Sequence, residues 1–161
     1  MSMVFKRHKA AGERRESVAR LVKILLSSRE PAILSTHLRE LLTVLLWKLT
    51  EADSPKYRTR YQSTEALRDS GGKLHHEHVY QRAKMIDALL NAQPHEVDEI
   101  LELAVGCTIT RPEAERLRRF DDDYGWERYR KAGIEIMDTS QNPPVAISFP
   151  PSLVGALAHK C

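Results

Sequence analysis

The sequence predicts a mostly α-helical single domain of about five to seven helices, with at most one or two short β-elements. A length of 161 residues suits one domain, and 42% apolar with 29% charged residues is typical of a globular chain. Five separate segments repeat apolar residues at helical spacing, whereas strand-like alternation is confined to short stretches. We expect a flexible basic arm at residues 1–12, the helical globular domain at 13–140 and a Pro-rich apolar tail at 141–161.

Two long helices are predicted in the first third of the chain. The first covers about residues 13–28, and its apolar residues form one continuous face: Val18, Leu21, Val22, Leu25 and Leu26. The second covers about residues 31–52, where a stripe of leucines is widened by Ile33, Val44, Leu46 and Trp47. So broad an apolar surface predicts the central, most buried helix of the domain.

The middle of the chain is more broken. Residues 53–62 interrupt the helical pattern, after which Ser63 or Thr64 can cap a short helix. Residues 73–79 are too few for periodicity to distinguish a strand from the entry of a helix. An amphipathic helix of about 15 residues follows, with one apolar face made by Val79, Ala83, Ile86 and Leu90.

The last third predicts three further helices. Residues 94–106 carry one apolar stripe, and Thr110 and Glu113 have the spacing of a capping box that begins the next helix. A final helix stops at Gly133, and the alternation at residues 134–136 predicts a short strand. The two candidate strands are therefore minor elements of a helical domain.

Composition excludes several classes of protein. The only cysteines are Cys107 and Cys161, which excludes a disulfide framework and a cysteine zinc site. No apolar run approaches the roughly 20 residues of a membrane span, and the first residues lack the apolar core of a secretory signal. We therefore expect a cytoplasmic protein that does not act at a membrane.

Charge is unevenly distributed along the chain. Residues 1–84 have a net charge of +8 and residues 85–161 a net charge of −5, which together give the overall +3. This asymmetry predicts an anionic partner for the first half, or two faces that neutralise each other within the fold or between subunits. The apolar tail predicts docking on the chain's own domain, on a protein partner or on a second copy.

One segment of the positive half interleaves cations with aromatic residues: Lys56, Tyr57, Arg58, Thr59, Arg60 and Tyr61. Cations can neutralise phosphates while tyrosines stack on unpaired bases, so these five charged and aromatic residues are candidate nucleic-acid contacts. The alternative is a solvated loop whose tyrosines pack on the helices. We take nucleic acid as the expected partner.

The densest group of potentially reactive side chains is His75, His76, Glu77 and His78. On a helix His75 and His78 would share a face, and on a strand His76 and His78 would. Either pair can bind a divalent ion such as Mg²⁺, Mn²⁺ or Zn²⁺ if further ligands come from elsewhere, and Glu77 with His78 is the predicted metal pair. The three histidines are candidate catalytic residues. The alternative is a polar junction in which Glu77 is a favourable first-turn acid.

Residues 74–82 resemble the first motif of HNH-type ββα-metal nucleases, with His76, Glu77 and His78 at the matching positions. The resemblance implies a metal-dependent nuclease. A histidine near a strand end would activate water while the metal stabilises the leaving phosphate oxygen.

A second resemblance covers the same stretch. Arg68 and His75 are similar to the Arg-x(4–6)-His motif of HEPN ribonucleases, which are all-helical and cut RNA without metal. It implies His75 as the general acid–base and Arg68 as a phosphate clamp. The leading hypothesis is an intracellular nucleic-acid-associated protein, for which a small HNH-like metal-dependent nuclease and a toxin-like effector are candidate forms and a metal-independent HEPN-like ribonuclease is an alternative. The rival from a different class is a non-enzymatic helical module that binds a protein.

Overall fold

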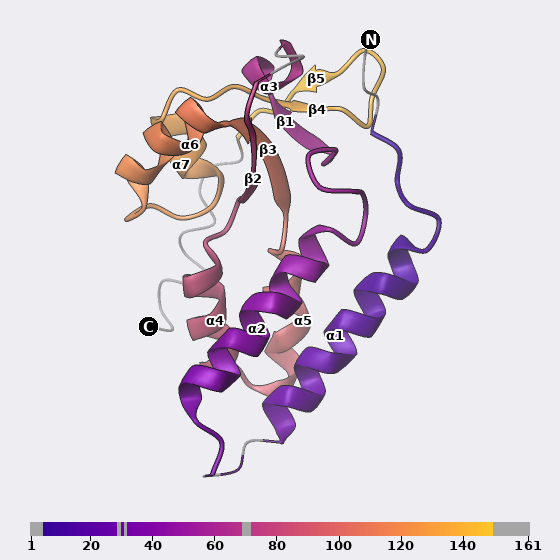
Figure 1. Cartoon of the computed structure of the whole chain (residues 1–161), viewed down its shortest axis with the longest axis vertical. Helices are drawn as coiled ribbons and strands as arrows, with labels where there is room; N and C mark the ends of the chain where they lie inside the picture. Colours follow the sequence, from indigo (N-terminus) through magenta and orange to yellow (C-terminus); the bar gives the residue numbers. More distant parts are fainter. Residues whose placement is uncertain (1–4, 29, 31, 69–71, 150–161) are drawn as a thin grey trace.

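The computed structural model describes residues 5–28, 30, 32–68 and 72–149. One half of the molecule is helical and the other is built on a β-sheet (Figure 1). The helical half consists of α1 (Ala11–Ser27), α2 (Ser35–Thr50), α4 (Arg82–Asn91) and α5 (Val97–Glu102). Residues 1–4 of the predicted arm and 150–161 of the predicted tail lie outside the described part of the chain.

The sheet has five strands: β1 (Tyr61–Ser63), β2 (Leu74–His78), β3 (Gly106–Thr110), β4 (Ile136–Asp138) and β5 (Val145–Ala146). Their order is β2-β3-β1-β4-β5; β1 and β3 are parallel and the other neighbours are antiparallel. Helices hold 52% of the described residues and strands 13%. The prediction of a mostly helical domain with at most one or two short β-elements is therefore wrong, because the protein is a mixture of α and β structure.

The physical reason lies in the strands themselves. β1 has three residues and β5 has two, which is too short for alternation to be read from sequence. β3 is buried at four of its five positions, so it has no polar face to alternate with an apolar one. The helical pattern of residues 94–106 predicts a helix that ends at Gly106, whereas Gly106 begins strand β3 in the structure.

Short helices connect the strands: α3 (Thr64–Arg68), α6 (Arg111–Leu117) and α7 (Trp126–Lys131), with 3₁₀ turns η1 (Pro94–Glu96) and η2 (Arg118–Phe120). The predicted capping box before α6 is confirmed. Thr110 Oγ1 accepts a hydrogen bond from the Glu113 amide at 3.4 Å, and the Glu113 carboxylate accepts one from the Thr110 amide at 2.8 Å. Glu113 also accepts from the Ser63 hydroxyl at 2.6 Å, which ties β1 to α6.

Two apolar clusters form the core. One joins α1, α2, α4 and α5, and the other joins the sheet to α6 and α7; Tyr80 packs against both. Only one face of α2 is buried, along Leu38, Leu42, Leu46 and Leu49. The breadth of its stripe predicts the central, most buried helix, but burial covers this one face, and Leu41 and Val44 on the outer side are 52% and 56% exposed.

The described parts of the arm and tail lie against the domain. The Phe5 amide donates to the Thr139 carbonyl at 2.9 Å, and the His8 amide to the Asp53 carbonyl at 2.7 Å. In the tail, β5 pairs with β4, and Phe149 packs near Trp126 with 6.2 Å between ring centroids. None of the helices in the described residues has the length and apolar character needed to span a membrane.

Candidate nucleic-acid interface

Strand β2 divides the predicted histidine cluster between two sides of the sheet. Successive residues of a strand point to opposite faces. His76 and His78 contact α2, whereas His75 and Glu77 face the segment that contains α7. The strand alternative, in which His76 and His78 share a face, is the one that is found.

His76 and His78 converge on one hydroxyl at the end of α2. Thr50 Oγ1 lies 3.1 Å from Nε2 of His76 and 3.5 Å from Nε2 of His78, and it donates to the Trp47 carbonyl at 2.9 Å. Because its single proton is used in that bond, the hydroxyl accepts from His76, which assigns the ring proton to Nε2. Nδ1 of His76 is then an unprotonated nitrogen, and it is buried with no hydrogen-bond partner among the described residues.

Burial keeps both rings neutral at neutral pH. His76 is 3% exposed and His78 is 6% exposed. Burial, assisted by the nearby charge of Lys56, lowers the pKa of His76 to about 4 although Glu51 opposes the shift. Burial, assisted by Arg82, lowers the pKa of His78 to about 3. Both imidazoles are therefore neutral hydrogen-bonding groups rather than cations, and they are weak bases while they stay buried.

Gly106 on β3 makes room for the His76 ring. A Cβ atom at this position would lie 2.8 Å from Cε1 of His76 and 3.1 Å from its Nε2. Because β3 is a central strand, its backbone cannot easily move away.

Gly106→Ala should therefore lower the free energy of unfolding by about 1–3 kcal/mol through overpacking, measured by urea denaturation. Gly12→Ala is the matched control, because nothing lies within 4 Å of the added methyl group and alanine favours the helix. Equal effects of the two substitutions would contradict the close approach to His76.

Trp47 packs against the two histidines and makes cation–π contacts with two basic side chains. Its ring centroid is 5.2 Å from that of His76 and 5.2 Å from that of His78. Lys56 Nζ lies 5.3 Å and the Arg82 guanidinium carbon 5.2 Å from the Trp47 ring, and Lys56 Nζ also lies 5.0 Å from the Tyr57 ring. We name this group the Trp47 cluster; its members are Trp47, Thr50, Lys56, Tyr57, His76, His78 and Arg82.

Tyr57 is held in an unusual backbone conformation. Its φ of 65° lies in the left-handed region, which few residues other than glycine adopt. The turn that contains it is closed by a hydrogen bond of 3.0 Å from the Arg58 amide to the Pro55 carbonyl. Strained backbone of this kind is often found at binding sites, where it fixes the direction of a side chain.

Arg60 and Tyr61 of the predicted cation–aromatic segment form contacts outside the Trp47 cluster. Arg60 forms an ion pair with Asp138, with Nε 3.0 Å from each carboxylate oxygen, and this bond lowers the pKa of Asp138 to about 2. Tyr61 packs edge-on against Trp126 at 5.2 Å. Arg58 is exposed. The structure thus brings Lys56 and Tyr57 to the histidines and places Arg60 and Tyr61 in other contacts.

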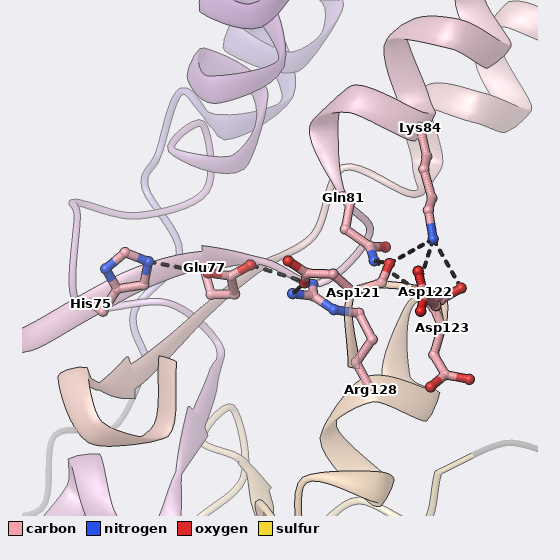
Figure 2. Close-up of polar contacts among 8 residues, drawn as sticks. All are labelled: His75, Glu77, Gln81, Lys84, Asp121, Asp122, Asp123 and Arg128. Carbon is pink, nitrogen blue, oxygen red and sulfur yellow. Dashed lines mark hydrogen bonds and ion pairs between the residues drawn. The ribbon is translucent and has the colours of Figure 1, made fainter. Parts of the chain in front are cut away.

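The other face of β2 carries a series of polar contacts that runs from His75 to Asp121 (Figure 2). His75 Nε2 lies 3.1 Å from Glu77, and Arg128 bridges Glu77 at 3.4 Å and Asp121 at 2.6 Å. The Arg128 side chain is only 3% exposed. Glu77, the carboxylate that contacts His75, is therefore engaged by a buried cation, and this network holds α7 and the loop before it against β2.

The acidic loop at residues 121–123 is fixed by donors from α4 and the residue before it (Figure 2). Lys84 Nζ lies 2.9–3.2 Å from the carbonyl oxygens of all three aspartates, and Gln81 donates to those of Asp121 and Asp123. The loop is an anchored connection between η2 and α7.

The predicted metal site does not fit this arrangement. Glu77 and His78 are on opposite faces of β2, so the structure does not bring the predicted pair together. Asp87 and Asp98, two carboxylates that could have completed such a site, form ion pairs with Arg39 and Lys23 in the helical half. Across the described ranges, no group of three or more His, Cys, Asp or Glu side chains could hold a metal ion.

The HEPN resemblance also lacks its scaffold. Arg68 ends α3 and His75 lies within β2, so the motif falls across a helix and a strand. An all-helical site of the kind that the resemblance implies is not present in the described residues.

Sequence reasoning missed three members of the Trp47 cluster. The sequence pattern places Trp47 in the apolar stripe of the second helix and does not single out Thr50 or Arg82. Arg82 stands four residues after His78 at the start of a helix, which is the signal that could have drawn attention to it. Comparisons with protein-family models, with curated proteins and with solved structures found no match for this chain. The function is therefore argued from the geometry alone.

Proposed function

We propose that the protein binds single-stranded nucleic acid at the Trp47 cluster. One observation carries the proposal: two features identified separately in the sequence, the cation–aromatic segment and the histidine strand, meet around one tryptophan ring. In this interface Lys56 and Arg82 neutralise phosphates, while Trp47 and Tyr57 offer faces on which unpaired bases stack.

The free energies of the two contacts favour replacing the cations over the Trp47 ring with a stacked base. A cation over an exposed aromatic ring contributes about 0.5–1 kcal/mol, whereas stacking of a base contributes about 1–3 kcal/mol. Lys56 is exposed and Trp47 and Arg82 are partly exposed, so these side chains can rearrange at small cost. A strand that pairs its phosphates with the two cations can therefore place a base against Trp47.

The test is the salt dependence of binding. With a labelled oligothymidylate or oligouridylate, the double variant Lys56→Ala/Arg82→Ala should bind more weakly. Its log–log salt slope should be smaller by about 1.4, because each phosphate contact on a single strand contributes about 0.7. Fluorescence anisotropy measures both the affinity and the salt slope. The titrations are run between about 50 and 200 mM NaCl, where the salt dependence of binding is large.

The control removes the same charge from another part of the surface. Arg118→Ala/Arg119→Ala changes two exposed residues of η2 and should leave the salt slope within experimental error of the wild type. Identical slopes for the wild type and the Lys56/Arg82 variant would place the phosphates elsewhere, and an unbound oligonucleotide under every condition would refute the proposal.

Phosphodiester cleavage is the second candidate function. It is favoured by the buried Nδ1 of His76, which lacks a hydrogen-bond partner within the described residues. While the ring stays buried its pKa of about 4 makes it a weak base, so this role requires the ring to become exposed. Since the ring is 3% exposed, Trp47 must move before a phosphodiester reaches it. Cleavage of RNA or DNA in EDTA that His76→Gln abolishes would support this role. Cleavage only with Mg²⁺ or Mn²⁺ would favour the metal-dependent alternative, and none in any buffer would leave binding alone.

A further inference from the structure

The exposed apolar side chains of this protein are concentrated on one face. Among the described residues seven large apolar side chains are exposed, and Val145 on β5 is the one outside the α1–α2 region. The other six belong to α1, α2 and the segment before α2, and are 43–60% exposed: Leu21, Ile24, Ile33, Leu34, Leu41 and Val44. We name these six residues the α1–α2 patch.

The two helices present this patch on a common outer surface. α1 and α2 lie side by side, and they pack against each other and against α4 and α5 (Figure 1). Leu21 and Ile24 are nearly one turn apart on α1, while the neighbouring Val22 is completely buried. On α2 the same relation holds for exposed Leu41 and Val44 beside buried Leu42. The exposed residues therefore form outward ridges of two adjacent helices.

We infer that the α1–α2 patch pairs with the same patch of a second copy of the chain, around a twofold axis. Six half-exposed aliphatic side chains leave about 500 Å² of apolar surface, at the upper end of what monomers usually expose as one patch. A twofold interface uses the patch twice, which gives about 1,000 Å² before any rim residue is counted. This reaches the lower limit of about 1,000 Å² for a specific protein interface, and the rim residues add to it.

The charges beside the patch also favour a second copy of the chain as the partner. Glu40 and Lys48 are both exposed on α2 and stand about one turn before and one turn after Val44. A twofold axis that passes near Val44 with the two α2 helices antiparallel places Glu40 of each copy opposite Lys48 of the other. The Lys48 side chain is 63% exposed, and its ion pair with Glu51 is long, at 3.7 Å. Lys48 therefore remains able to reach across the interface.

Sedimentation equilibrium of the full chain tests the inference. We expect the wild type to be a dimer at micromolar concentration and Val44→Asp to raise the dissociation constant at least 100-fold, because a carboxylate would enter the apolar centre. Val145→Asp is the matched control, because it places the same charge at a valine on the sheet that is 46% exposed, against 56% for Val44, and should leave the dimer unchanged. Circular dichroism verifies that both variants are folded.

A charge exchange tests the symmetry of the pairing without touching an apolar residue. Glu40→Lys and Lys48→Glu should each weaken dimerisation about tenfold, because each creates like-charge pairs across the axis. The double variant Glu40→Lys/Lys48→Glu should restore it. Failure of the double variant to restore the dimer would overturn this geometry. A wild type that stays monomeric at every concentration would overturn the inference and assign the patch to another segment of the chain or to a different protein.

Discussion

Arg128→Ala should lower the free energy of unfolding by about 3 kcal/mol, because it removes a buried cation from its ion pairs. Its side chain is 3% exposed and bridges Glu77 to Asp121. Without it Glu77, which is 20% exposed, keeps His75 as its one side-chain partner among the described residues and loses most of its compensation for burial. Asp121 is 57% exposed and can be hydrated, so the loss should lie at the lower end of the range for buried ion pairs.

Arg130→Ala on the same helix is the matched control. Arg130 pairs with Glu127 three residues earlier, and its side chain is 58% exposed. A surface pair of this kind is screened by water and contributes little to stability, so urea denaturation should show a much smaller change than for Arg128→Ala. Similar changes for both variants would mean that the network in Figure 2 does not hold α7 to β2.

Stability should fall steeply as the pH is lowered from about 6.5 to 4. His76 and His78 have pKa values lowered to about 4 and about 3, whereas in the unfolded chain histidine titrates near 6.5. Within this window the unfolded state binds protons that the folded state does not, so acid favours unfolding. Each ring should reduce the free energy of unfolding by about 1.4 kcal/mol per pH unit, and the loss should slow as the pH falls below the folded pKa values.

Urea denaturation at pH 7.5, 6.0 and 5.0 should therefore show stability at its highest at pH 7.5, in the plateau above about 6.5. His76→Gln should reduce the slope below pH 6.5 by about half, since one of two depressed histidines is gone. His95→Gln changes an exposed histidine and should leave the slope unchanged. A pH slope that is the same in all three proteins would contradict the burial of a neutral His76.

Much of the helical half could be predicted because its helices have one apolar face. The stripe from Val18 to Leu26 placed the first helix over residues 13–28, against Ala11–Ser27 in the structure. The Thr110–Glu113 pair located the start of α6 through local hydrogen bonds alone. Where the signal is local, sequence reasoning succeeded.

The sheet could not be predicted because its order depends on contacts between distant segments. β1 is three residues long and gains its position only by pairing with β3 and β4, more than 40 residues further on. The same limit applies to the candidate site. Which histidines face α2 follows from the register of β2 on β3, and the role of Trp47 follows from helix packing that places Lys56 and Arg82 beside its ring.

The central claim is that nucleic acid binds at the Trp47 cluster, and the emission of Trp47 tests it most directly. Trp126→Phe leaves Trp47 as the only tryptophan and keeps an aromatic ring next to Tyr61 and Tyr129. Titration with an oligothymidylate or oligouridylate should quench Trp47 saturably as a base stacks on it, with a midpoint that moves to higher concentration as NaCl is added. Binding detected by anisotropy of the labelled oligonucleotide, with no change in Trp47 emission, would contradict the claim.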